Sequence, residues 1–145
     1  MVSALLVGIA TLLVSVLSYG TATALIVHFV APLVGNGHAG WSIRKNLAVL
    51  LVVSLATALV HLVQISLWAL ALLMCGEAHS FDDAFYWSAQ NYTALGYGDF
   101  MLSAPWRLLG PLEAVNGLLL FGLSTAVMFA IMSRLIANRL HGNRP

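Results

Sequence analysis

The residues with the clearest capacity for chemistry form one short run, Thr93-Ala94-Leu95-Gly96-Tyr97-Gly98-Asp99. Its chemistry would come from the main chain, because Gly96 and Gly98 adopt left-handed backbone conformations without steric cost. Alternation of left-handed and ordinary residues aims successive carbonyl oxygens in one direction, as a ladder of cation ligands requires. Two glycines beside an aromatic residue more often mark only a turn. The prediction therefore depends on the segments that flank the run.

Those segments have the composition of a membrane protein. Hydrophobic residues make up 61% of the 145 residues and charged ones 8%, and the mean hydropathy is +0.94. Three uncharged stretches, residues 2–34, 46–76 and 114–133, each reach or exceed the roughly 20 residues that a membrane-spanning helix needs. The first is much longer than the apolar core of a signal peptide, about 7–15 residues, and it has no basic start. We therefore expect three spans, the first of which stays in the mature protein.

The charges predict how the spans are oriented. Five of the six basic residues lie on one side of the predicted topology: Arg44, Lys45, Arg134, Arg139 and Arg144. Arg107 and all five acidic residues lie between the end of the second span and the outer part of the third. Positive charge marks the cytoplasmic side, so we expect the N-terminus and the 93–99 run outside and the C-terminus in the cytoplasm. The topology accounts for these few basic residues, which therefore indicate no nucleic-acid surface. Cys75 is the single cysteine of the sequence, so an internal disulfide is excluded.

A short helix is predicted directly before the run. Ser80-Phe81-Asp82-Asp83 is typical of a capping box, with Ser80 as N-cap and Asp83 as the third-position acid. The helix from 81 to 92 would be only about 18 Å long, so it cannot cross a bilayer. It is interpreted as a re-entrant helix, which is allowed at membrane depth where protein covers it or where it lines a watery cavity. Its C-terminal end would bring partial negative charge toward the middle of the membrane.

Polar residues at helical spacing mark one face on each of the first two spans. They are Thr11, Ser18, Thr21 and His28 on the first, and Ser54, Thr57, His61, Gln64 and Trp68 on the second. Polar groups are costly in hydrocarbon, so we expect both faces to pack against protein. His61 is either a packing histidine or a proton sensor, and a metal pair with His28 is disfavoured by their different depths. Pro32 and the glycine-rich stretch 35–40 are expected to end the first helix.

The run and its flanks resemble the pore-loop family of potassium channels, whose filter signature is written TxxGYGD. The similarity covers about residues 72–135 and includes Tyr86-Trp87-Ser88 in the short helix and Gly117 in the last span. It implies an all-α membrane protein with three transmembrane helices, a re-entrant pore helix and a selectivity-filter loop, assembled as a tetrameric pore. It also implies that the aromatic pair braces Tyr97 and that Gly117 is the inner-helix hinge. The first span has no counterpart in two-span members.

The resemblance implies a role for each matching residue. Residues 93–99 form the filter, in which the backbone carbonyls of Ala94, Leu95, Gly96 and Tyr97 bind K+. Tyr86, Trp87 and Gln90 support the filter, and the hinge, cavity and gate comprise Gly117, Leu118, Phe121, Gly122, Thr125 and Phe129. The corresponding layout is an extra N-terminal helix and cytoplasmic turn (1–40), followed by a pore domain (41–145). That domain holds an outer helix 46–76, a pore helix 81–92, a filter 94–99 and an inner helix of about 106–138, with Pro111 either in its first turn or at a kink.

Three positions depart from the family pattern. Ala94 replaces the threonine whose hydroxyl forms the innermost site, and Gln90 replaces a frequent glutamate behind the filter. A neutral amide at Gln90 can still donate a hydrogen bond to Asp99. Leu95 replaces the usual valine or isoleucine, a milder change because the ion meets the main-chain carbonyl.

The leading functional hypothesis is a homotetrameric subunit that conducts K+ passively in the cell membrane, with no enzymatic activity and no cofactor beyond the permeant ion. A weakly selective monovalent cation channel is the alternative that Ala94 suggests. A non-conducting pore-loop scaffold or regulatory subunit is a third hypothesis, and a transporter with several filters per chain is disfavoured because one run is present. The spans lack a series of basic residues, so an arginine-rich voltage sensor is not expected, and the gating stimulus and auxiliary partners stay open.

Overall fold

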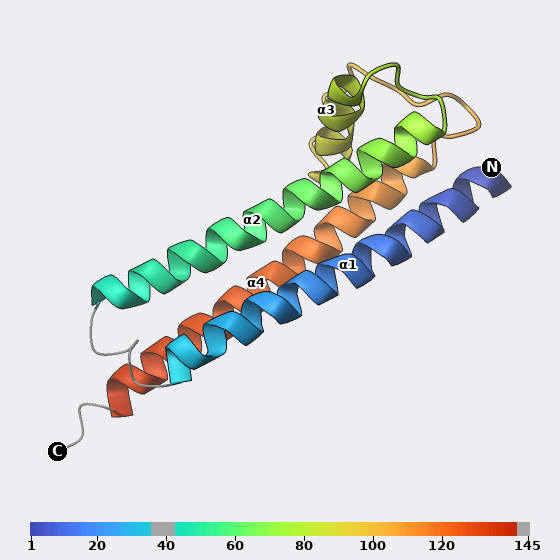
Figure 1. The fold of residues 1–145 in the computed structure, drawn as a ribbon. Helices are drawn as coiled ribbons and strands as arrows, with labels where there is room; N and C mark the ends of the chain where they lie inside the picture. Colours follow the sequence, from blue (N-terminus) through green and yellow to red (C-terminus); the bar gives the residue numbers. More distant parts are fainter. Residues whose placement is uncertain (36–42, 142–145) are drawn as a thin grey trace. The chain divides into compact units, whose positions relative to one another are not determined.

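The computed structural model describes residues 1–35 and 43–141, which form four helices and no strand. The helices are α1 (Val2–Gly35), α2 (Ile43–Met74), α3 (Phe81–Tyr92) and α4 (Leu109–His141) (Figure 1). Three segments are long and apolar enough to cross a membrane, namely Val2–Pro32, Ile43–Met74 and Leu109–Ala137. The predicted all-helical membrane fold with three spans is confirmed.

The long helices differ at their ends from the prediction. α1 continues through Pro32 to Gly35, because a proline in the last turn removes only one late hydrogen bond. α2 begins three residues earlier than expected, since Arg44 and Lys45 are good helix formers. The inner helix begins at Leu109 and not near 106, which puts Pro111 in its first turn, where a missing N–H is tolerated. Most of the predicted turn at 35–40, and the boundary at residue 40, lie outside the described residues.

α2 ends at Met74, two residues before the end of the predicted helix, and Gly76 makes the turn that follows. Its φ of 73° is left-handed, and its N–H donates to the Leu73 carbonyl at 3.0 Å while the Glu77 N–H donates to Leu72 at 3.1 Å. This pair of bonds is a Schellman motif, which turns the chain sharply out of a helix. The turn sends the chain directly toward Ser80 and α3.

The chain forms two compact units. Unit 1 comprises Met1–Tyr19 and His61–Phe121, and unit 2 comprises Gly20–Val60 and Gly122–Pro145. In unit 1, α3 lies beside the C-terminal part of α2 (Figure 1), where small residues at 69, 78 and 84 are buried together. In unit 2 the core consists of Val30, Val34, Val53, Ile131 and Leu135. Unit 1 therefore carries α3 and the 93–99 run.

The buried face of α1 in unit 1 differs from the predicted one. It is formed by Ala4, Gly8, Ser15 and Tyr19. A side chain at Gly8 would meet Leu112 of α4, so this small residue allows close helix contact, as is common in membrane bundles. Ser18 belongs to the edge of the face, whereas Thr21 and His28 are exposed. The prediction that those two residues face protein was wrong for the single chain.

Candidate functional site

The N-terminus of α3 is fixed by the predicted cap. The Asp83 N–H donates to Ser80 Oγ at 3.1 Å, and the Ser80 hydroxyl donates to Asp83 Oδ2 at 2.7 Å. Asp82 and Asp83 also place negative charge in the first turn, where the helix dipole favours it. These local interactions confirm the predicted short helix from 81 to 92.

The C-terminus of α3 leads into the run through a second Schellman motif. The Ala94 N–H donates to the Asn91 carbonyl and the Leu95 N–H donates to Gln90, both at 2.9 Å. The left-handed residue of this motif is Ala94, with φ of 56°, although glycine is usual there. An alanine in this conformation costs about 1–2 kcal/mol. The motif explains why the chain leaves the helix at this residue.

Three alternate residues of the run are left-handed. Ala94, Gly96 and Gly98 have φ values of 56°, 55° and 79°, so the predicted alternation at the two glycines is confirmed and extends one step toward α3. Residues 93–99 are all exposed, and the side chains of Leu95 and Tyr97 are 54% and 68% exposed. Within the described residues no group of three or more His, Cys, Asp or Glu side chains could hold a metal. The backbone carbonyls of the run are the cation ligands that the sequence predicts.

Thr93 joins α3 to the run. Its hydroxyl donates to the Ala89 carbonyl at 2.7 Å, and it is the C-cap residue of α3. The oxygen of a hydroxyl that donates its proton keeps its lone pairs, so the place of Thr93 in an ion-binding filter stays a prediction.

Gln90 contacts Asp99 as predicted. Its Nε2 donates to Asp99 Oδ2 at 3.3 Å, and the Tyr86 hydroxyl interacts with the same carboxylate. The two residues thereby tie the end of the run at Asp99 to α3. The predicted contact between Gln90 and Asp99 is confirmed, and the support of a filter by Tyr86 and Gln90 stays a prediction.

Trp87 packs on the residue that follows the run. Its ring stacks on Phe100, with centroids 3.4 Å apart and planes inclined by 2°. Trp87 thereby supports the loop after the run. Tyr97 is 68% exposed in the single chain, and an aromatic cuff around it stays a prediction.

Gly117 of α4 lies against the end of α3. A Cβ at this position would collide with the backbone carbonyl of Tyr92, so only glycine allows this approach. The Tyr92 hydroxyl lies 2.9 Å from His61 Nδ1. Burial raises the pKa of Tyr92, with Tyr19 and Glu113 adding to the effect, which keeps the phenol neutral. Gly117 thus lets α4 approach the C-terminal end of α3, and its role as a hinge stays a prediction.

Phe121 of α4 packs on the buried histidine of α2. Its ring stacks on His61 with centroids 4.4 Å apart and meets Tyr92 edge-on at 5.5 Å. This contact supports the packing interpretation of His61. Phe121 is also partly exposed, as are Leu118, Thr125 and Phe129, and a Cβ at Gly122 would meet nothing within 4 Å. Their place around a cavity stays a prediction.

Glu113 is a buried carboxyl that sequence reasoning passed over. Its side chain is 0% exposed, and the buried Ser88 hydroxyl donates to its Oε1. Ser88 belongs to α3 and Glu113 to α4, so the bond joins the pore helix to the inner helix beside the Gly117 contact. An acidic residue inside a predicted membrane helix indicates a functional or structural site by default. The position of Glu113 in the predicted inner helix was therefore a signal in the sequence.

Glu77 anchors the loop that returns from the run. Its two carboxylate oxygens accept hydrogen bonds from the Ser103 N–H at 2.8 Å and from the Ser103 hydroxyl at 2.5 Å. The turn after α2 thereby holds the loop between the run and α4.

A buried polar network joins α1 to α2 and α4 in unit 1. Ser15 donates to Gln64 Oε1 at 2.7 Å and accepts from Asn116 Nδ2 at 2.7 Å, while Gln64 Nε2 donates to Ser18 at 3.1 Å. Ser15, Gln64 and Asn116 are at most 1% exposed. The predicted polar stripe of α2 is confirmed at His61, Gln64 and Trp68, which are buried. Ser54 is exposed, and its hydroxyl contacts the Leu50 carbonyl of its own helix at 2.8 Å and Met128 Sδ of α4 at 4.0 Å.

This network predicts a defined cost for Gln64→Leu. Hydrogen bonds between membrane helices contribute about 0.6–2 kcal/mol, so losing the bonds to Ser15 and Ser18 should lower the thermal midpoint of the purified protein measurably. Ser66→Ala is the matched control, because the Ser66 hydroxyl donates to the Leu62 carbonyl of its own helix and not to the network. Equal midpoints for the two variants would contradict the network.

With this geometry established, comparison with known proteins identifies the family. Residues 48–134, which include most of α2, all of α3, the run and most of α4, match a family described as ion channels. The chain belongs to this ion channel family. Within it, the chain is 34% identical over 99 residues to the inward rectifier potassium channel Kirbac3.1 of Paramagnetospirillum magnetotacticum. The match covers 63% of this chain and 33% of that relative, so the chain spans about a third of the relative's length.

The two matches support the resemblance to pore-loop potassium channels and place the chain in a family of membrane ion channels. No solved structure matches the chain. α1 up to Gly35 precedes the matched residues, so its attachment through Ser15 is a feature that the family match does not describe.

Proposed function

We propose that the chain is one subunit of a homotetrameric, potassium-selective channel. The observation that carries the proposal is the alternation of left-handed residues at Ala94, Gly96 and Gly98, directly after the C-terminus of α3. In this proposal the carbonyls of Ala94, Leu95, Gly96 and Tyr97 replace the water around K+. Conduction is passive, K+ is the permeant ion, and no cofactor is needed.

The electrostatics of α3 favour a cation at the inner end of the filter. The C-terminus of a helix carries a partial negative charge of about −0.5, and the chain passes from it into the run at Ala94. Four such ends around an axis offer negative potential to an ion that is losing its water. Conduction needs binding that is strong enough for entry and weak enough for exit, which a series of similar carbonyl sites provides.

A tetramer follows from the geometry of one filter per chain. A single extended run presents carbonyls to one side of an ion and cannot surround it. Residues 93–99, including the apolar Leu95, are exposed in the single chain, as expected of a segment that other copies cover. We propose that Leu118, Thr125 and Phe129 face the cavity below, where a ring of Phe129 side chains gates by dewetting.

We propose a multi-pass location in the cell membrane, with the N-terminus outside and the C-terminus in the cytoplasm. The support is the positive-inside distribution of Arg44, Lys45 and the basic residues after position 133. The filter then opens to the outside, and the gate at Phe129 lies toward the cytoplasm.

A weakly selective monovalent cation channel is the second candidate, and Ala94 is the observation that favours it. Four threonine hydroxyls at this level would add a ring of ligands, which alanine lacks. The Ala94 carbonyl can still bind the ion, and water can replace each missing ligand at a cost of about 0–2 kcal/mol. We therefore expect a weakened innermost site in a filter that keeps its selectivity.

Ala94→Thr should restore the inner site and tighten block by Ba2+ applied from the cytoplasmic side. The added hydroxyl ring would hold the divalent ion where the wild type offers only water. Because residue 94 is left-handed, Ala94→Gly is the matched control, which relieves backbone strain but adds no hydroxyl. Equal Ba2+ block in Ala94→Thr and Ala94→Gly, together with a non-selective wild type, would favour the second candidate.

Flux from liposomes tests the function itself. Purified protein reconstituted into vesicles should dissipate a K+ gradient and leave a Na+ gradient largely intact, and native mass measurement in mild detergent should give four chains. A stable tetramer without any cation flux would support the scaffold hypothesis, whereas equal K+ and Na+ flux would support the weakly selective channel.

A further inference from the structure

Unit 2 carries most of the positive charge of the chain and no acidic side chain. Its segments, Gly20–Val60 and Gly122–Pro145, contain five of the six basic residues, whereas all five acidic residues lie between positions 77 and 113. A cation of unit 2 consequently has no carboxylate side chain within the unit to pair with. An anionic molecule bound to this unit would therefore meet unopposed positive charge.

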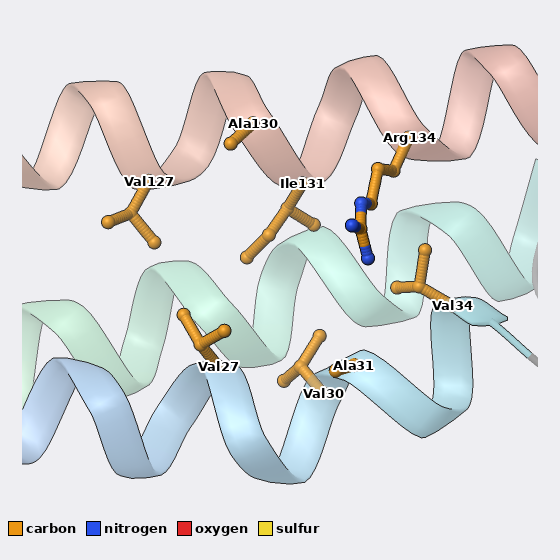
Figure 2. Close-up of a pocket in the computed structure, with 8 residues that line it drawn as sticks. All are labelled: Val27, Val30, Ala31, Val34, Val127, Ala130, Ile131 and Arg134. Carbon is orange, nitrogen blue, oxygen red and sulfur yellow. The ribbon is translucent and has the colours of Figure 1, made fainter.

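Arg134, one of these basic residues, lines a groove between α1 and α4. Aliphatic side chains from residues 27–34 of α1 and 127–131 of α4 line the groove, and Arg134 is the charged residue of its lining. Figure 2 shows the Arg134 side chain extending from α4 into the space between the helices, with Val34 of α1 nearby. The groove has a volume of ≈ 290 Å³, near the lower limit of about 300 Å³ for small-molecule sites.

The groove lies close to the ends of two candidate membrane spans. The span of α1 ends at Pro32 and that of α4 at Ala137. Arg134 precedes the latter by three residues, a rise of about 4.5 Å. A guanidinium at this depth reaches the headgroup region while its stem stays in hydrocarbon. The aliphatic part of the groove then lies at the level of the lipid chains.

We propose that this groove binds an anionic phospholipid, with part of one acyl chain against the aliphatic wall and the phosphate on Arg134. The planar guanidinium suits bidentate bonding to phosphate oxygens. A net negative headgroup supplies the counter-charge that unit 2 lacks, which a zwitterionic headgroup does only in part. The groove is too small for a whole lipid, so the remaining chain extends along the exposed helix surface.

Lipid retention by the full-length protein tests the headgroup part of the proposal. The protein is equilibrated with equal amounts of phosphatidylglycerol and phosphatidylcholine, and the retained lipids are counted by native mass spectrometry. The wild type should prefer phosphatidylglycerol, and Arg134→Gln should lose about fivefold of that preference, equivalent to the ≈ 1 kcal/mol of one basic residue near an anionic surface. Arg44→Gln is the matched control, because Arg44 is an exposed cation of the same unit outside the groove. An equal loss in both variants would show a diffuse surface attraction and overturn the site.

A second variant tests the acyl-chain part without changing charge. Ala130→Phe should fill the groove and reduce retention of both lipids, whereas unchanged retention would contradict the proposal. Val27→Cys in a Cys75→Ser background distinguishes a second copy as the occupant. Efficient disulfide formation between subunits at position 27 would show that protein covers the groove, and it would overturn lipid binding. These measurements do not depend on ion selectivity, so their failure leaves the proposed channel function standing.

Discussion

Gly117→Ala is expected to abolish conduction. A Cβ at residue 117 would collide with the Tyr92 carbonyl, which belongs to the backbone of α3 and cannot rotate away as a side chain does. Overpacking of this kind costs about 1–3 kcal/mol, or about 4–12 kcal/mol when four subunits each carry the change. The inner helix would push the pore helix away at the residue that precedes the filter. K+ flux from vesicles and the yield of tetramer measure the effect.

Gly122→Ala is the matched control on the same helix. A Cβ there meets nothing within 4 Å in the chain, and alanine is favoured over glycine in a helix by about 0.8–1.0 kcal/mol. Gly122→Ala should therefore assemble and conduct. If Gly117→Ala conducts as well as Gly122→Ala, the contact with Tyr92 does not position the pore helix.

The second large effect is expected for Gly96→Ala, which should remove the preference for K+ over Na+. Gly96 has φ of 55°, and open space surrounds its Cβ position, so the cost arises from the backbone. A left-handed alanine costs about 1–2 kcal/mol, and the chain can relieve it by turning a carbonyl away from the axis. A loss of about 1.4 kcal/mol in ion binding is already tenfold. Reversal potentials under bi-ionic conditions measure the change.

Gly76→Ala separates strain from function in this experiment. Gly76 is also left-handed, with φ of 73°, and it also has no neighbour within 4 Å of its Cβ position, but it ends α2 outside the filter. The two variants should lose similar stability. Selectivity should fall only in Gly96→Ala, and an equal preference for K+ in both variants would show that the 93–99 run is not the filter.

Local signals account for the parts that the sequence predicted well. The pore helix was predicted from 81 to 92 because the Ser80–Asp83 cap involves residues three apart. The left-handed glycines 96 and 98 follow from residue type alone. Ala94 was not predicted to be left-handed, because its conformation results from the way α3 ends and not from a preference of alanine.

Long-range pairing explains the parts that the sequence did not reveal. Asn116 and Ser15 are 101 residues apart and Ser88 and Glu113 are 25 apart, and no local pattern indicates which polar residues meet. The same limit applies to Trp87, whose partner is Phe100, and to Phe121, which packs on His61 although its spacing fits a cavity stripe. Helical periodicity predicts which face of a helix a side chain lies on, but it does not predict which residue of another helix that side chain contacts.

The reversal potential of the wild-type channel in a planar bilayer, with K+ on one side and Na+ on the other, tests the central proposal most directly. For a monovalent ion each tenfold preference shifts this potential by about 59 mV. The carbonyl filter of residues 94–97 predicts a shift well beyond about 59 mV in the direction of K+ selectivity. A current that reverses near 0 mV would contradict a potassium-selective filter.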